Sequence, residues 1–208
     1  MPKTKKTKDK KIERIIKLIK ERKLKEALEL TGLKDVEFLL NIGISIGKKG
    51  AHEDAEKVFE RILELNPNNA EAWFKKAEAL GKLGKYEEAV KCYDQALKIT
   101  PNSAKVWSNK GVALENLGKY EEELQCYDQA LKINPNEAKI WSNKGVALEN
   151  LGKYVEALKC YDRALKIKPN LAEAWYDKGS DLGHLGRHLE AVKCYDRALK
   201  INPNFIEA

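Results

Sequence analysis

The sequence predicts an all-α protein, a solenoid built from stacked antiparallel helical hairpins that repeat every 34 residues. All four tryptophans keep this interval, at Trp73, Trp107, Trp141 and Trp175. Every proline except Pro2 keeps it too, at Pro67, Pro101, Pro135, Pro169 and Pro203. Residues 104–137 and 138–171 differ at only seven of 34 positions, so the two segments are copies of one unit. A fixed period of this kind is typical of supersecondary units that stack on their neighbours.

Each unit is predicted to form two helices. Trp107, Gly111 and Leu114 follow the spacing i, i+4, i+7, which places them on one face of a first helix. Gly118 then ends that helix. The same spacing recurs on a second helix, at Tyr120, Leu124, Tyr127 and Leu131. Pro135 has a fixed φ and no N–H group, so the second helix must end before it.

The pattern of one unit is that of a known repeat family. In residues 70–103 the matching positions are Trp73, Ala77, Leu80, Gly84, Tyr86, Ala89, Tyr93, Ala96 and Pro101. The units therefore resemble the tetratricopeptide repeat (TPR). This resemblance implies a right-handed superhelix in which the first helix of each unit lines a concave groove. It also implies an interaction module that binds other proteins or peptides.

The resemblance divides the chain into segments. We expect a basic, disordered tail over 1–11 and a degenerate helical cap over 12–34. Residues 36–69 match the repeat pattern loosely and are expected to form a divergent repeat. Four close repeats follow, over 70–103, 104–137, 138–171 and 172–205.

Composition and cysteine spacing argue against several classes of protein. No stretch approaches 18 uninterrupted apolar residues and the N-terminus lacks the apolar core of a signal peptide, so we expect a cytoplasmic protein without a membrane span. The cysteines occur once in each close repeat, at Cys92, Cys126, Cys160 and Cys194. Equivalent positions in stacked units should lie about 10 Å apart, which is too far for a disulfide. We expect free thiols, with no metal and no other cofactor, because no clustered histidine or CxxC accompanies them.

The net charge of +7 is concentrated at the N-terminus. Residues 1–11 hold six lysines against one acidic residue, Asp9. A run of this kind is usually a solubilising, disordered tail. The alternative is nonspecific contact with nucleic acid or another polyanion, which would weaken steeply with added salt. Beyond this tail we expect no binding to nucleic acid.

The sequence offers poor candidates for catalysis. Among the three histidines, His52 and His188 occupy the position of Tyr86, where a packing aromatic is expected. His184 precedes His188 by four residues, but Gly186 lies between them at the turn, so they do not share one helical face as a metal pair would. No glycine-rich phosphate loop occurs. We therefore expect no enzyme activity.

A polar stripe on the first helices is the predicted binding surface, and the resemblance places it in the concave groove. One column of this stripe comprises Asn41, Lys75, Asn109, Asn143 and Asp177. The rest of the predicted peptide-binding set is Asn116, Asn150, Lys105, Lys139 and Tyr176. An asparagine side chain both donates and accepts hydrogen bonds, so a ladder of them can bind the backbone of an extended peptide. The alternative is that duplication merely copied exposed polar residues.

The chaperone-binding branch of the family clamps a C-terminal carboxylate with lysine, arginine and asparagine side chains. In this chain Asn109, Lys139 and Asn143 match that pattern only in part. Glu115 and Glu149 also place acid in the groove. We therefore expect a different ligand.

Glu123 is a departure from the repeat, because it occupies a position that the other close repeats fill with alanine. An ionised carboxylate buried there without a partner would be costly. We expect Glu123 to reach the edge of the packing or to pair with Lys110 or Lys144.

Self-association is the alternative function. The apolar side of the last helix, around Val192, Tyr195 and Leu199, is expected to stay partly exposed and to invite pairing with another chain.

Overall fold

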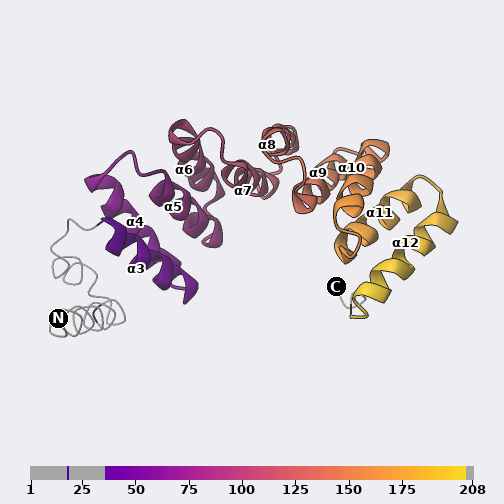
Figure 1. Ribbon diagram of the computed structural model, residues 1–208, viewed down its shortest axis with the longest axis horizontal. Helices are drawn as coiled ribbons and strands as arrows, with labels where there is room; N and C mark the ends of the chain where they lie inside the picture. Colours follow the sequence, from indigo (N-terminus) through magenta and orange to yellow (C-terminus); the bar gives the residue numbers. More distant parts are fainter. Residues whose placement is uncertain (1–17, 19–35, 205–208) are drawn as a thin grey trace. The chain divides into compact units, whose positions relative to one another are not determined.

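A computed structural model of the protein describes residue 18 and residues 36–204 (Figure 1). Residues 36–204 form ten α-helices and contain no strand. The predicted tail over 1–11 lies outside the described residues. The predicted cap over 12–34 lies outside them as well, apart from Leu18, which packs against the first hydrophobic cluster.

The helices alternate between two roles along the chain. The first helices of the hairpins are α3 (Val36–Lys48), α5 (Ala70–Lys82), α7 (Ala104–Glu115), α9 (Ala138–Asn150) and α11 (Ala172–His184). The second helices are α4 (His52–Leu65), α6 (Tyr86–Ile99), α8 (Tyr120–Ile133), α10 (Tyr154–Ile167) and α12 (His188–Ile201).

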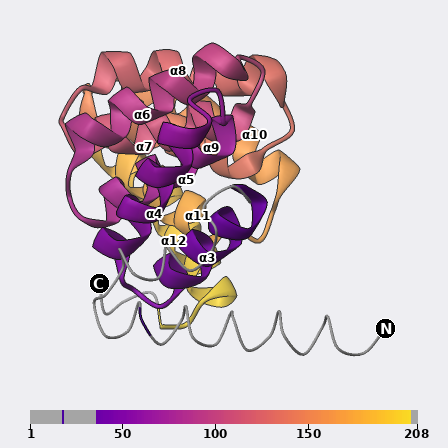
Figure 2. The same cartoon turned by 90° about the vertical axis from the view of Figure 1, so that its left-hand side faces the viewer.

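The chain forms two compact units, the first ending at Ile99 and the second beginning at Thr100. In the first unit α3 pairs with α4, α5 pairs with α6, and α4 packs on α5 (Figures 1 and 2). In the second unit the hairpins are α7 with α8, α9 with α10 and α11 with α12, and they stack through α8 on α9 and α10 on α11. The predicted all-α solenoid of antiparallel hairpins is therefore confirmed within each unit.

The hydrophobic core is shared between neighbouring hairpins. Tyr127 and Leu131 of α8 form one buried cluster with Ile140 of α9, and Trp141 packs against that cluster. Tyr161 of α10 is fully buried in a second cluster that extends to α11. Burying a large apolar side chain stabilises the folded chain by about 1.5–3 kcal/mol. Here much of the surface that covers these side chains belongs to the next hairpin. A single hairpin cannot bury its own apolar face.

A glycine in the first helix makes room for the aromatic ring of the second. A Cβ atom placed on Gly111 would lie 2.7 Å from Cε1 of Tyr127, which is closer than van der Waals contact allows. Gly43 faces Phe59 and Gly179 faces Tyr195 in the same way. The small residue is therefore required by packing.

The turns are built from the same parts in every hairpin. The glycines that follow the first helices all have a positive φ, between 69° and 84°, which favours glycine; they are Gly50, Gly84, Gly118, Gly152 and Gly186. Before each later first helix, the indole N–H of the tryptophan donates to the carbonyl of the proline six residues earlier, as from Trp141 to Pro135 at 2.9 Å. Each tryptophan thus fixes the loop that enters its own helix.

Ion pairs join consecutive hairpins at one repeated position. In the second unit Lys144 of α9 reaches Asp128 of α8 at 2.5 Å, and Lys178 of α11 reaches Asp162 of α10 at 2.5 Å. Each lysine also lies over the tryptophan ring of its own helix, with Nζ of Lys144 5.7 Å from the Trp141 centroid. The acidic partners are about half-exposed, so each pair contributes only about 0.2–1 kcal/mol.

All four cysteines are buried and have free thiols, as predicted. Burial raises the pKa of Cys92 and of Cys160 to about 11. Because the thiolate is the reactive form, these side chains act as small packing groups at neutral pH.

The glycine contact yields a stability prediction. Gly111→Ala should lower the free energy of unfolding by about 1–3 kcal/mol, because the added methyl group collides with the buried Tyr127 ring. Gly183→Ala is the matched control: an added Cβ there meets no atom within 4 Å, and alanine favours a helix by up to about 1 kcal/mol. Urea unfolding of both variants checks this. Equal effects of the two substitutions would contradict the packing role.

Candidate functional site

The candidate site lies on the first helices, and the structure brings its residues together within each unit. In the second unit α9 and α11 contact each other, and Trp107 of α7 and Trp141 of α9 pack on one cluster. Asn109, Asn143 and Asp177 therefore stand at equivalent positions on three first helices of one stack, and all three are partly buried. In the first unit α3 and α5 also contact each other, and they carry the exposed Asn41 and the partly buried Lys75.

The charge of Lys75 is already engaged within its own helix. Its Nζ lies 2.7 Å from Oε2 of Glu78, one turn along the same helix. The same ammonium group lies 5.2 Å from the centre of the Phe74 ring. A ligand would therefore compete with these contacts for Lys75.

The second predicted column is less uniform than the sequence suggests. Helix α7 ends at Glu115, so Asn116 lies just beyond it and uses its amide to donate to the carbonyl of Val112 at 2.8 Å. Asn150 is instead the last residue of α9, and it is exposed. The Asn116 amide N–H group therefore already forms a hydrogen bond to its own helix, whereas the sequence analysis predicted that it binds a peptide.

The remaining predicted residues lie at the ends of the stripe. Lys105 and Lys139 are exposed in the first turns of α7 and α9. Tyr176 is 46% exposed, and its ring centre lies 5.6 Å from that of Tyr195 with the planes tilted by 50°. His184, which ends α11, stacks on Tyr154 with ring centres 4.8 Å apart. Its position is explained by packing.

The prediction for Glu123 is wrong. The side chain is 0% exposed, and neither carboxylate oxygen has a hydrogen-bond partner. Lys144 pairs with Asp128 instead. Burial, followed by the charge of Glu115, raises the pKa of Glu123 to about 8, whereas the nearby Tyr127 hydroxyl lowers it. The carboxyl group is therefore mainly protonated at neutral pH, which avoids the greater cost of a buried charge.

A second buried carboxylate was missed by sequence reasoning. Asp181 of α11 is 0% exposed, and both of its carboxylate oxygens lack a hydrogen-bond partner. Burial, with the charges of Glu149 and Asp177, raises its pKa to about 7. The other close repeats have alanine at this position, at Ala79, Ala113 and Ala147. That substitution is the signal that would have revealed Asp181.

Asp181 belongs to a cluster around one tyrosine. The Tyr161 hydroxyl donates to Oε2 of Glu149 at 3.1 Å. Burial, and then the charges of Asp177, Glu149 and Asp181, raise the pKa of Tyr161. Burial also raises the pKa of Asp177 to about 7, with further contributions from Glu149 and Glu173. The surroundings of Tyr161 in the second unit are thus markedly acidic.

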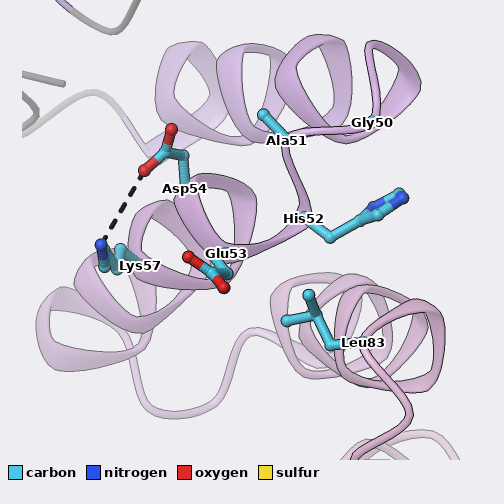
Figure 3. Close-up of a pocket in the computed structure, with 7 residues that line it drawn as sticks. All are labelled: Gly50, Ala51, His52, Glu53, Asp54, Lys57 and Leu83. Carbon is cyan, nitrogen blue, oxygen red and sulfur yellow. Dashed lines mark ion pairs between the residues drawn. The ribbon is translucent and has the colours of Figure 1, made fainter.

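The structure also has a small hollow in the first unit. It lies where α4 begins beside the end of α5, and its volume is about 340 Å³ (Figure 3). Its lining residues are Gly50, Ala51, His52, Glu53, Asp54, Lys57 and Leu83. Asp54 and Lys57, one turn apart on α4, form an ion pair of 3.8 Å. None of the predicted peptide-binding residues lines this hollow.

Over the described part of the chain, no three histidine, cysteine, aspartate or glutamate side chains are placed to hold a metal ion. Within the same residues, no helix is both long enough and apolar enough to cross a membrane.

The buried Glu123 predicts a pH-dependent loss of stability. Its pKa is about 8 in the folded chain and 4.5 ordinarily, so the folded state binds the extra proton and stability falls as pH rises between these values. Glu123→Ala, which restores the residue of the other close repeats, should raise the free energy of unfolding at pH 8 by about 1–3 kcal/mol.

Urea unfolding at pH 5 and pH 8 measures this effect. The increase in the free energy of unfolding caused by Glu123→Ala should be larger at pH 8 than at pH 5. The near-isosteric Glu123→Gln should show the same difference between the two pH values. A destabilised Glu123→Ala at pH 8 would show that the carboxylate has a stabilising partner.

Family models match most of the chain. The tetratricopeptide repeat model matches residues 104–137, 138–171 and 172–205 in succession. Related models described as tetratricopeptide repeat match residues 36–69 and 58–91, and one described as TPR repeat matches 77–118.

The chain is also similar to one curated protein and to several solved structures. The uncharacterized protein MJ0572 of Methanocaldococcus jannaschii is 42% identical over 48 residues, which are 23% of this chain and 56% of that protein. The match thus spans little more than half of the relative's length. Among solved structures, MamA 41-end from Desulfovibrio magneticus RS-1 superposes with a TM-score of 0.76 at 19% identity, covering 82% of this chain and 97% of that one.

YrrB, described as a TPR protein with an unusual peptide-binding site, gives a TM-score of 0.72 at 22% identity and covers 88% of this chain and 93% of that one. At such identities the likeness shows the fold alone. The repeats and the fold together support a protein-interaction or scaffold module. The chain belongs to the tetratricopeptide repeat family.

Proposed function

We propose that the protein is a non-enzymatic interaction module that binds an extended peptide, or an extended segment of a partner protein, along the first helices of its second unit. The observation that carries this proposal is the column of Asn109, Asn143 and Asp177 on α7, α9 and α11. These polar side chains are only partly buried, on helices whose opposite faces are fixed by the shared core.

The chemistry of the column suits backbone recognition. Each asparagine can accept from a peptide N–H and donate to a peptide C=O, so binding requires no particular ligand side chain at that point. A hydrogen bond of this kind contributes about 0.5–1.5 kcal/mol, so affinity depends on several acting together. The acidic groups nearby, Glu115 and Glu149, disfavour a ligand that ends in a carboxylate.

Selection from a library of random dodecapeptides on phage tests the proposal. The wild-type protein should enrich peptides that bind in solution, and Asn109→Ala with Asn143→Ala should weaken that binding by about tenfold or more, as the loss of two or more hydrogen bonds requires. The control is Asn102→Ala with Asn170→Ala, which changes two exposed turn residues.

Circular dichroism of both variants should show the helix content of the wild-type protein, so that a loss of binding cannot be attributed to unfolding. Full binding by Asn109→Ala with Asn143→Ala would reject the column as the site. Failure of the wild-type protein to enrich any peptide would reject the proposal as a whole.

Self-association through α12 is a second candidate function, favoured by one specific observation. Val192 of α12 is 56% exposed, whereas Leu158, at the equivalent position of α10, is 7% exposed because α11 packs on that helix. Leu189, one turn before Val192, is 83% exposed. Val192 therefore lies on the face of α12 that corresponds to the covered face of α10 and presents an apolar side chain to solvent, and Leu189 adds a second exposed apolar side chain.

Sedimentation velocity over a concentration series tests this candidate. If the surface pairs, the sedimentation coefficient should rise with concentration, and Leu189→Lys with Val192→Lys should abolish the rise because buried charges oppose association. A coefficient that stays at the monomer value for the wild-type protein would contradict self-association. Polyanion binding by the lysine tail over 1–11 remains a prediction from the sequence.

A further inference from the structure

Within the part of the chain that the structure describes, the charges acting on Asp177 and Asp181 beside Tyr161 are negative. Besides burial, the groups that raise the pKa of Asp177 are Glu149 and Glu173, and those that raise the pKa of Asp181 are Glu149 and Asp177. All of these groups are carboxylates. The lysine of the same helix, Lys178, is held by Asp162 on α10 and lies over Trp175.

The carboxylates of this cluster occupy two levels. Glu149 and Asp177 are partly exposed on α9 and α11. Beneath them Asp181 is fully buried, and its two oxygens have no hydrogen-bond partner. Tyr161 fixes Glu149 by donating to it at 3.1 Å. A cation arriving from solvent can therefore reach the two partly exposed carboxylates, and the buried Asp181 adds charge of the same sign.

We infer that this cluster is a subsite for a cationic side chain, arginine or lysine, of the bound peptide. The inference rests on the proposed function, which it deepens by stating one chemical property of the partner. An arginine guanidinium fits best, because its planar fork can donate to two carboxylates at once and it is weakly hydrated. A metal ion is disfavoured because the described side chains do not form a group able to hold one.

A buried, unpaired aspartate is otherwise difficult to explain at this position. Alanine fills it in the three preceding close repeats, so packing does not require a carboxylate. An unpartnered buried acid destabilises the free protein. A cation supplied by the ligand would offset that cost only in the complex, so Asp181 favours basic ligands over neutral ones.

The repeats themselves supply the test variant. Asp177→Asn with Asp181→Ala replaces both residues by those at the same positions of the preceding repeat, Asn143 and Ala147. Both replacements therefore suit the fold. The matched control is Glu156→Gln with Asp196→Asn, which removes two negative charges from exposed positions on α10 and α12.

The experiment uses the dodecapeptides that the wild-type protein selects from the phage library. These peptides should share an arginine or lysine, and replacing it with citrulline or acetyl-lysine should lower the affinity by about tenfold or more. Asp177→Asn with Asp181→Ala should lower the affinity for the basic peptide by a similar factor and should therefore remove most of the difference in affinity between the basic peptide and its neutral version. The control variant should retain the difference between the two peptides.

Affinity should also increase from pH 6 to pH 8. The pKa values of Asp177 and Asp181 are both about 7 in the unbound protein, so the higher pH leaves more of the charged form that a cation binds. The groups facing them, Glu149, Glu173 and Tyr161, must be included when the profile is fitted. Asp177→Asn with Asp181→Ala should flatten the profile.

The outcomes separate this inference from the proposed function. Selected peptides without a shared basic residue, or a basic peptide that binds the double variant as tightly as the wild-type protein, would overturn the inference and leave peptide binding standing. If the wild-type protein selects no peptide, both are rejected.

Discussion

The fold depends on apolar faces that consecutive hairpins must bury in each other. Tyr127 and Tyr161 lie at the centre of this packing, because each ring rests on a glycine of its own hairpin and is covered by the next one. The glycines at the turns, the bond from each tryptophan to its proline, and the ion pairs between hairpins all hold the helices in the positions that this contact requires. Repeat proteins in general gain stability from such nearest-neighbour interfaces.

We propose that the face of each first helix that this packing leaves partly exposed is used for recognition. The second unit departs from the repeat at two buried positions, where carboxylates replace the alanine of the other close repeats. Glu123 and Asp181 lack hydrogen-bond partners, and burial raises the pKa of each. Such groups reduce the stability of the free chain, and residues that do so are typical of sites where function competes with stability.

Much of the fold could be predicted from the sequence, because spacing determines it. The 34-residue interval predicts the hairpins, and the positions of proline and glycine predict where the helices end. The recurring aromatic residues predict the core that neighbouring hairpins share. The site was less predictable, since a column of residues does not reveal how each side chain is engaged. Lys144 contacts Asp128 and leaves Glu123 buried, while Lys75 turns to Glu78. The unusual position of Asp181 could have been predicted from the sequence, because this residue replaces an alanine of the other close repeats, as Glu123 does.

The central claim is that the second unit recognises an extended ligand through its first helices. Backbone amide chemical shifts of isotopically labelled protein, recorded during titration with a selected peptide, test it most directly. The account predicts that the largest changes fall on α7, α9 and α11, with the strongest near Asn143 and Asp177. Changes centred on α8, α10 and α12, with the first helices unaffected, would contradict it.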